Sequence, residues 1–377
     1  MERLEINNKC MIKKFSVRNF KNFKDDIIID FSHTRDYSFN NELIVDGIIN
    51  KAMILGKNSS GKSNLGTAIM DITTHLTDNK WDNTFYLAYL CGDSLENYAS
   101  FKYEMVFNDD NVKYYYQKDF QRRLVYEELR INDELCFAYN YLTGQFENSI
   151  DEGKTVDISK YNNIGISVLK FIYNNTLYWS ENNPFRLFME FVNHMLWFRS
   201  LRGNEFMGLM PNGEDLNDFI VNNGLLSEFE SFLKGLDQNY KLCITNGPLG
   251  KKVIGVEYKR FSVDFYCVAS TGTLTLWLLF YWLHRAEKSI SFMYIDEFDA
   301  FYNYSLSSKV LQILKESKYQ TIVTSHNMKV VSNDILRPDC YLLLKNGKIV
   351  SLADTVNTTI RKANNLEKIM IENNLAM

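Results

Sequence analysis

The sequence has little proline, little histidine and no long apolar run. Only four of its 377 residues are proline and five are histidine. Its most apolar stretch, Leu274 to Leu283, is too short to cross a bilayer and is followed by His284 and Arg285, so it predicts a buried helix. The first residues, Met1 to Lys14, are charged and lack the apolar stretch of a secretory signal. We therefore expect a cytoplasmic protein with no membrane segment.

The cysteines, the charges and the absence of repeats further limit the class of protein that this sequence can encode. The six cysteines are scattered, with no C-x-x-C pair and no histidine at metal spacing, which is typical of thiols in a reducing cytosol. The net charge of −4 argues against a uniformly basic nucleic-acid binder. No heptad run, internal repeat or low-complexity tract is present, so we expect no long coiled-coil arm.

The most informative stretch runs from Leu55 to Asn64 and reads Leu-Gly-Lys-Asn-Ser-Ser-Gly-Lys-Ser-Asn. Apolar strand residues precede it, and an amphipathic helix is expected from Asn64 to His75, so the stretch is a P-loop in a strand-loop-helix context. Backbone N–H groups of such a loop wrap a phosphate, and the helix N-terminus adds partial positive charge. The predicted nucleotide-binding residues are Gly56, Lys57, Asn58, Ser59, Ser60, Gly61, Lys62, Ser63 and Asn64.

Two of these residues have specific predicted roles. The Lys62 ammonium is expected to reach the β- and γ-phosphates of ATP, and the Ser63 hydroxyl is expected to hold Mg²⁺. Gly56 and Gly61 bound the loop and permit the close approach of its backbone to the phosphate. The loop alone therefore predicts phosphate binding.

Acidic residues follow an apolar strand far downstream of the P-loop. Asp296, which ends the run Phe292 to Ile295, is predicted to bind Mg²⁺ directly or through water. Glu297 points differently because successive strand side chains alternate, so we predict that it polarises the attacking water. His326 lies at the end of the next expected strand and is predicted to hydrogen-bond the γ-phosphate and hold the catalytic water, the alternative being an ordinary surface or core histidine.

Hydrophobic periodicity gives the order of the elements. The expected strands lie within residues 11–31, 99–142, 240–268, 290–295, 321–325 and 340–352, with turns at 108–111, 132–134 and 346–347. The expected helices, besides that of the P-loop, lie at 184–201, 215–236, after residue 273 and at 305–317. The C-terminal part therefore predicts a βαβ unit.

The order of these motifs resembles a known family. P-loop, long insertion, Ser-x-Gly before a helix, Asp-Glu and a strand-end His are arranged as in the ABC-type ATPase heads of structural-maintenance-of-chromosomes (SMC) and RecF-like proteins. More narrowly, the chain resembles bacterial AAA15 ATPases of the overcoming-lysogenization-defect (OLD) and anti-phage defence group. The segments that carry this resemblance are Phe15 to Phe23, Tyr103 to Leu129, Asp296 to Ala300, Thr324 to Asn327 and Leu336 to Asp339.

The resemblance implies an α/β fold of the ABC-type P-loop ATPase head. Such a head has a mixed sheet with flanking helices, an antiparallel β lobe and, in this chain, a helical insertion subdomain. The expected division assigns residues 1–93 and 241–377 to the head, 94–180 to the β insertion and 181–240 to the helical insertion.

The resemblance also implies a composite site. Ser270 and Gly272 would form the signature that closes on the γ-phosphate held by another subunit, in a head-to-tail homodimer. Read without the family, Ser-Thr-Gly-Thr is an ordinary helix start.

The chain departs from the family pattern in three places. Phe301 to Tyr304 stands where relatives often have a Ser-Leu-His-Pro-like run, and no glutamine between Lys62 and Tyr116 can serve as the Q-loop Mg²⁺ ligand. No fused TOPRIM nuclease domain is expected after Met377.

The leading hypothesis from the sequence is a slow, Mg²⁺-dependent ATPase that acts as the nucleotide-gated sensor or scaffold of an anti-phage defence complex. By resemblance, it would control a separate effector, a TOPRIM or HNH nuclease or another toxin, with a nucleic acid or a phage protein as trigger. One alternative is a scaffold that binds ATP without hydrolysing it. Another is a RecF/SMC-like DNA-repair ATPase, for which the seven Lys or Arg between Met1 and Lys24 are the only hint, and we interpret these residues rather as a solvated strand face.

Overall fold

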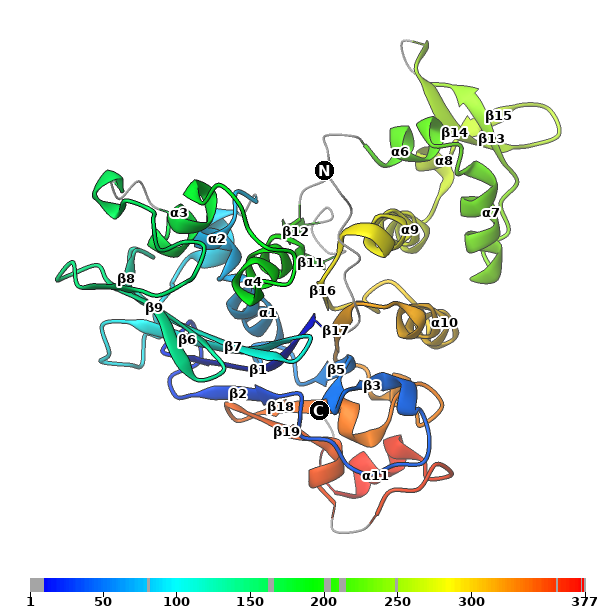
Figure 1. Cartoon of the computed structure of the whole chain (residues 1–377). Helices are drawn as coiled ribbons and strands as arrows, with labels where there is room; N and C mark the ends of the chain where they lie inside the picture. Colours follow the sequence, from blue (N-terminus) through cyan, green and yellow to red (C-terminus); the bar gives the residue numbers. More distant parts are fainter. Residues whose placement is uncertain are drawn as a thin grey trace.

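Two seven-stranded sheets form most of the molecule (Figure 1). The computed structural model describes residues 10–79, 82–161, 166–199, 205–209, 215–247, 250–356, 359–373 and 375. One sheet is antiparallel, and the other is mixed with a parallel centre. A small lobe lies apart from both sheets, at the upper right of Figure 1.

The antiparallel sheet has the strand order β10-β9-β8-β7-β6-β1-β2. Its strands are β1 (Cys10–Arg18), β2 (Ile27–Asp30), β6 (Ala99–Phe107), β7 (Asp110–Lys118), β8 (Leu124–Ile131), β9 (Glu134–Asn140) and β10 (Phe146–Asn148). The antiparallel pairs expected within residues 11–31 and 99–142 are confirmed. Because β1 also pairs with β6, the two groups form one sheet, which their separation in sequence did not indicate.

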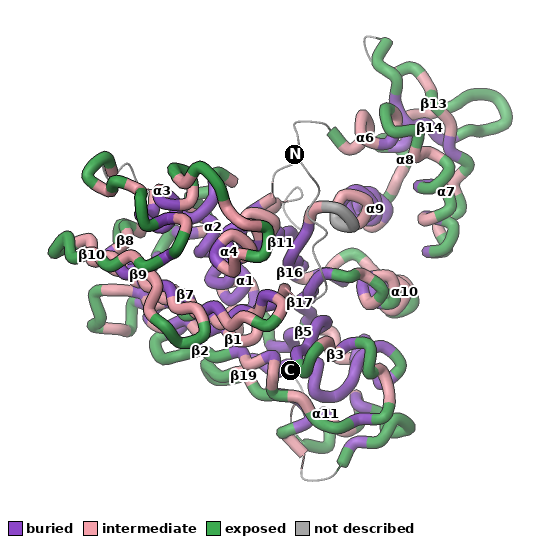
Figure 2. Tube along the Cα trace, in the orientation of Figure 1, coloured by how far each residue is buried: buried purple, intermediate pink, exposed green. Residues whose placement is uncertain are grey.

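The mixed sheet has the order β12-β11-β16-β17-β5-β18-β19. Its strands are β5 (Lys51–Leu55), β11 (Met195–Arg199), β12 (Glu205–Gly208), β16 (Phe292–Asp296), β17 (Gln320–Ser325), β18 (Tyr341–Lys345) and β19 (Lys348–Ser351). The five inner strands are parallel, and an antiparallel strand lies at each edge. Every residue of β5, β16 and β17 is buried, as expected for strands covered on both faces (Figure 2).

Helix α1 (Lys62–Met70) is packed between the two sheets. On one side, a Cβ atom added to Gly66 would lie 2.5 Å from Cε1 of Tyr294 in β16, so the helix lies directly on the mixed sheet. On the other side, the Tyr103 hydroxyl of β6 donates to the carbonyls of Ala68 and Ile69, at 3.1 and 3.2 Å. The helix is buried at seven of its nine positions, so the expectation of an amphipathic helix is wrong here. It ends at Met70, and α2 (Thr73–Leu76) follows.

The remaining helices lie around the two sheets or belong to the small lobe. They are α3 (Val168–Asn175), α4 (Pro184–Asn193), α6 (Leu216–Asn222), α7 (Leu226–Gly235), α8 (Phe265–Val268), α9 (Thr271–Ser289), α10 (Tyr304–Glu316) and α11 (Leu366–Glu372). Helices α9 and α10 lie on the side of the mixed sheet away from α1 (Figure 1). Within the described residues, no helix combines the length and the apolar character that a membrane span requires.

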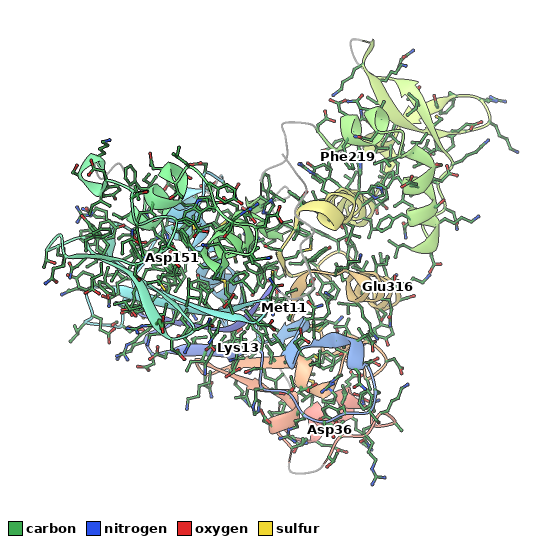
Figure 3. The ribbon with its side chains drawn as sticks, in the orientation of Figure 1. Met11, Lys13, Asp36, Asp151, Phe219 and Glu316 are labelled. Carbon is green, nitrogen blue, oxygen red and sulfur yellow. The ribbon has the colours of Figure 1, made fainter. Side chains whose placement is uncertain are left out.

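The small lobe joins α6, α7 and α8 to a three-stranded antiparallel sheet of β13 (Leu242–Asn246), β14 (Lys252–Glu257) and β15 (Ser262–Asp264). A two-stranded antiparallel ribbon, β3 (Ile44–Val45) with β4 (Ile48–Ile49), is not part of the lobe and directly precedes β5 in the chain. The lobe rests on α9 through Phe219 of α6, whose ring centroid is 4.9 Å from that of Tyr281 (Figure 3).

The helix expected over residues 184–201 is wrong beyond Asn193. Asn183 caps α4 by accepting from the N–H groups of Phe185 and Arg186, and α4 ends at Asn193. Residues 195–199 form β11, which pairs with β16 in the centre of the molecule. A short, fully buried apolar run has no period that separates strand from helix, which explains the error. The segment 181–240, expected to be a helical insertion, thus contributes two strands to the mixed sheet; Leu201 lies outside the described residues.

Candidate nucleotide-binding site

The candidate site lies at the C-terminal edge of the parallel strands. Strand β5 leads into the P-loop, while β16 and β17 end at Asp296 and Ser325. Strand β17 lies between β5 and β16, so Asp296 is two strands from the P-loop rather than on the neighbouring strand. Ligands of open α/β sheets bind at this edge, where the loops that follow several strands meet.

The P-loop has the backbone that a phosphate cradle requires. Ser59 and Gly61 have positive φ angles of 65° and 106°, and Gly61 precedes α1 as its N-cap. A Cβ atom on Gly56 would lie 2.6 Å from Oγ of Ser60, so the loop closes tightly only with glycine there. Lys57, Asn58 and Ser59 are exposed, whereas Ser60, Gly61, Ser63 and Asn64 are partly buried. The backbone N–H groups at the N-terminus of α1 therefore lie next to a loop that solvent can reach.

Lys62 is held by the loop itself. Its Nζ donates to the carbonyl oxygens of Gly56 and Lys57, at 2.6 and 3.1 Å. Burial lowers the pKa of Lys62, and the negative charges of Glu297 and Asp296 act in the opposite direction. The Tyr294 hydroxyl of β16 donates to the Lys62 carbonyl at 2.7 Å, which fixes the start of α1 against the sheet.

Asn22 supports the loop from outside, and the sequence analysis did not single it out. It lies in the turn between β1 and β2, where its Oδ1 accepts from Nδ2 of Asn64 at 2.7 Å and its Nδ2 donates to the Ser60 carbonyl at 3.4 Å. A Cβ atom on Gly61 would be 2.6 Å from Nδ2 of Asn22. In the sequence, only the resemblance of Phe15 to Phe23 pointed to this segment, and it gave Asn22 no physical role.

Asp296 combines complete burial with a free acceptor. Its Oδ1 accepts from the Thr324 hydroxyl at 2.8 Å, while its buried Oδ2 has no hydrogen-bond partner among the described residues. Burial raises the pKa of Asp296, and the hydroxyls of Ser63 and Thr324 lower it. The structure thus brings the two predicted Mg²⁺ ligands, Ser63 and Asp296, together.

Glu297 is held in an unusual backbone conformation. Its φ angle is +50°, in the left-handed region that costs a non-glycine residue roughly 1–3 kcal/mol. Its N–H donates to the Thr324 hydroxyl at 2.7 Å, so one hydroxyl contacts both predicted acidic residues. The Glu297 side chain is only partly buried, which leaves it accessible to a water molecule.

His326 and Asp299 lie at the same edge. His326 follows β17 and is exposed. Asp299 is buried and accepts from the Ser325 hydroxyl at 2.8 Å through Oδ2, while its Oδ1 has no hydrogen-bond partner in the described ranges. Burial raises the pKa of Asp299, while the Ser325 hydroxyl and the charge of His326 lower it. Asp299 was not among the predicted site residues, although its place three residues after Asp296 could have suggested it.

Ser270 and Gly272 are not brought to the P-loop of their own chain. Ser270 caps α9, its Oγ accepting from the Thr273 N–H at 3.2 Å, and it is exposed. A Cβ atom on Gly272 would lie 2.9 Å from the carbonyl oxygen of Phe301, which follows the β16 acids. Within the described residues, neither Ser270 nor Gly272 bonds to residues 56–64.

Arg199 is a further residue at this edge that the sequence analysis missed. It ends β11 directly opposite Asp296 of β16, and its Nη1 is 3.7 Å from Oδ2 of Asp296. On its other side it pairs with Glu205 of β12, through Nε at 3.0 Å and through Nη2. No local signal marked this arginine, because its strand was expected to be a helix.

These elements define a class. A P-loop connects β5 to α1, and the buried Asp296 with Glu297 after it ends β16, two strands away in the sheet. His326 follows β17, the strand between β5 and β16. Together these features form an ABC-type P-loop ATPase head. The fold is α/β, a mixed sheet with flanking helices plus an antiparallel β lobe.

Comparison with known proteins gives the family. Residues 51–332 match the family described as "AAA domain, putative AbiEii toxin, Type IV TA system", and the chain belongs to it. No curated protein sequence matches the chain.

Among solved structures, the chain is similar to an SMC head domain from Thermotoga maritima, with 14% identity, 90% of this chain and 98% of that chain covered and a TM-score of 0.45. It is also similar to the Smc head domain with an extended coiled coil bound to the C-terminal domain of ScpA, derived from Pyrococcus furiosus. For that structure the identity is 13%, the coverage 96% and 98% and the TM-score 0.47. At such TM-scores, nothing about function follows from the likeness.

Proposed function

We propose that this protein binds and slowly hydrolyses ATP with Mg²⁺ and acts as the nucleotide-gated sensor of a defence complex that controls a separate effector. The observation that supports ATP hydrolysis best is the convergence of Lys62, Ser63, Asp296 and Glu297 at one sheet edge. The family match supports a P-loop ATPase independently of that geometry.

The residues at this edge fit Mg²⁺. The Ser63 hydroxyl and Oδ2 of Asp296, which has no hydrogen-bond partner among the described residues, are hard oxygen donors, which Mg²⁺ prefers, and ATP phosphates and water complete such sites. Among the described residues, no group of three or more His, Cys, Asp or Glu side chains gathers as a metal site. When bound, Mg²⁺ neutralises charge on the transferred phosphoryl group. Lys62 would contribute a second positive charge on the phosphates, released from its loop carbonyls.

Hydrolysis needs a base for the attacking water, and Glu297 is the proposed base. Its partial exposure beside the buried Asp296 and the bond that holds its backbone to Thr324 support Glu297 in this role. Glu297→Gln should lower phosphate release about 100-fold while a fluorescent ATP analogue still binds. Glu316→Gln, an exposed glutamate on α10, serves as the matched control. If the wild type binds ATP and releases no phosphate, the non-hydrolysing scaffold is the correct function.

The position of Ser270 and Gly272 supports a site completed by a second copy. Within the described residues neither residue contacts the P-loop, and the exposed N-terminus of α9 can meet a phosphate held by another chain. Ser270→Asp keeps a helix-capping side chain but places a negative charge where the γ-phosphate would lie.

Mixing two inactive variants tests this pairing. Lys62→Ala removes nucleotide binding and Ser270→Asp damages the signature, so each homodimer is inactive. A mixed dimer combines the intact P-loop of one chain with the intact signature of the other. Random mixing should therefore restore about a quarter of the wild-type activity. No recovery, with dimers still forming, would contradict the composite site.

The defence role rests on the family. Its description names the AbiEii toxin of a type IV toxin–antitoxin system, which supports a partnership with a toxic effector in this chain as well. A TOPRIM or HNH nuclease, or another toxin, remains the proposed effector class. Expression of the product of the adjacent gene, alone and with this chain, tests the role. Wild-type chain should change the effector's toxicity, and Lys62→Ala should not; identical effects of the two would contradict nucleotide gating.

One observation favours a second candidate function, the direct binding of nucleic acid. The turn between β14 and β15 exposes Tyr258, Lys259, Arg260 and Phe261, and the two rings lie 5.8 Å apart. Within the described part of the chain, Lys259 and Arg260 form no ion pair. Exposed rings beside cations suit single-stranded nucleic acid. By contrast, Lys13, Lys14 and Arg18 of β1 are paired with carboxylates, which favours the solvated strand face.

Binding of a labelled single-stranded oligonucleotide at increasing salt decides this second function. The double variant with Lys259→Ala and Arg260→Ala should lose binding, and Lys13→Ala, a paired cation, should keep it. Absence of binding by the wild type at physiological salt would remove this candidate.

A further inference from the structure

Arg199 lies between two carboxylates because of strand register. In the mixed sheet, Arg199 is directly opposite Glu205 of β12 on one side and directly opposite Asp296 of β16 on the other. Side chains of such neighbours emerge on the same face, with Cβ atoms about 5 Å apart. The backbone therefore sets a row of Glu, Arg and Asp across three strands, independently of the exact rotamers.

The guanidinium divides its donors between the two acids. Nε and Nη2 contact Oε2 of Glu205, whereas Nη1 lies 3.7 Å from Oδ2 of Asp296. The guanidinium also lies over the Trp197 ring, with Cζ 5.6 Å from its centroid. The exposed fractions of the Asp296, Arg199 and Glu205 side chains are 0%, 15% and 27%, so the row runs from the buried site toward the surface.

The atom that Arg199 approaches is the one available to a metal. Within the part of the chain that the structure describes, Oδ2 of Asp296 has no hydrogen-bond partner, and a buried carboxylate without a countercharge is strongly unfavourable. Arg199 supplies this countercharge. A divalent cation at the same oxygen would meet a positive charge that is already there, and like charges at this range repel strongly inside a protein.

We propose that Arg199 is a positioning residue that competes with Mg²⁺ for Asp296, and that Glu205 weakens this competition by holding the guanidinium away. The inference rests on the proposed ATP site. Arg199 opposes metal binding, whereas Glu205 favours it through Arg199. The two residues thus set the Mg²⁺ concentration at which the site takes up its nucleotide with metal.

The proposal predicts that Arg199→Gln and Glu205→Gln shift the Mg²⁺ dependence of nucleotide binding in opposite directions. Arg199→Gln removes the competing charge, so the Mg²⁺ concentration for half-maximal binding of a fluorescent ATP analogue should fall about tenfold. Glu205→Gln frees the guanidinium to pair with Asp296, so that concentration should rise several-fold. The double variant should behave like Arg199→Gln alone, because Glu205 acts only through the arginine. A purely structural role would shift both single variants in the same direction.

The experiment uses the full chain and measures binding rather than turnover. Arg186→Gln and Glu190→Gln remove an Arg–Glu pair of similar burial on α4, joined at 2.8 Å, and should leave the Mg²⁺ dependence unchanged. Arg199→Lys keeps the cation and should stay close to the wild type, which also covers the case that Arg199→Gln folds poorly.

Two results would overturn the inference in different ways. If the wild type binds the analogue with a measurable Mg²⁺ dependence, but the single variants shift it in the same direction or not at all, the competition is refuted and the ATP site stands. If the wild type binds no nucleotide at any Mg²⁺ concentration, the proposed function fails and the inference fails with it.

Discussion

Replacing Thr324 by valine should disable the site without removing any predicted ligand or base. The Thr324 side chain is completely buried at the end of β17. Its hydroxyl donates to Oδ1 of Asp296 at 2.8 Å and accepts from the N–H of Glu297 at 2.7 Å. Valine has nearly the same shape as threonine, so the change removes two hydrogen bonds and little packing.

The magnitude follows from these two bonds. A hydrogen bond to a charged group contributes about 1.5–3 kcal/mol, and a buried N–H left without a partner costs about 1–3 kcal/mol. Thr324→Val should therefore lower the free energy of unfolding by about 2.5–6 kcal/mol. The N–H bond also holds Glu297 at its φ of +50°. When that backbone relaxes, the carboxylate moves, and displacement by about 1 Å can reduce turnover about 100-fold.

The assay compares Thr324→Val with Thr324→Ser, which keeps the hydroxyl. Urea unfolding gives the free energy of unfolding, phosphate release gives the turnover number, and a fluorescent ATP analogue gives the affinity. We expect the valine variant to lose turnover far more than affinity and the serine variant to recover most of both losses. Wild-type turnover in Thr324→Val would refute the reasoning, as would equal damage in the two variants.

Three further predictions concern the elements that carry the site. Gly66→Ala should force α1 away from β16, and should therefore lower the free energy of unfolding by about 1–3 kcal/mol and also lower the ATP affinity. Gly235→Ala, with open space around it, should change neither quantity. Urea unfolding and ligand binding measure the two effects. Burial lowers the pKa of Lys51 from 10.5 in the unfolded chain to about 7 in the folded chain. Between these two pH values the unfolded chain binds more protons than the folded chain, so the melting temperature should rise as the pH rises from about 7 to 10. Lys51→Met should remove that rise. Asp71→Asn leaves the buried Lys118 ammonium, 2.6 Å away, without its countercharge, and should cost about 3–5 kcal/mol in urea unfolding; a cost below about 1 kcal/mol would contradict the buried ion pair.

The parts of the fold that the sequence predicted are those with local signals. The P-loop carries its own glycines, and the turns at Asn108 and Asn132 have the positive φ angles, 56° and 51°, that hairpin turns require. Alternating burial along β6 reproduces the alternation of its sequence. The motifs at the ends of β5, β16 and β17 could be expected to meet because parallel strands end at one edge.

The parts that could not be predicted depend on pairing between distant segments. Strand β11 is buried at its first four positions, so its residues have no polar face to mark a period. Its neighbour β16 begins almost a hundred residues later, and only the register between the two strands places Arg199 opposite Asp296. Asn22 is similar, since its role depends on a turn that folds back onto Gly61 and Asn64.

The connectivity gives the small lobe two attachments to the nucleotide site. Strand β12, which carries Glu205, precedes the lobe in sequence, and α9, which begins after Ser270, follows it. Glu205, in β12, pairs with Arg199, which lies beside the chain's own Asp296. Ser270, at the start of α9, would face the phosphate held by a second copy in the proposed dimer. At its base, α9 also bonds to the segment after the β16 acids, through the Thr275 and Tyr302 hydroxyls at 3.0 Å. Under the proposed composite site, a partner that displaces the lobe would act on the proposed metal ligand of one site and on the proposed signature of the other at the same time. The lobe is therefore the part of the chain on which we expect the proposed effector or trigger to act.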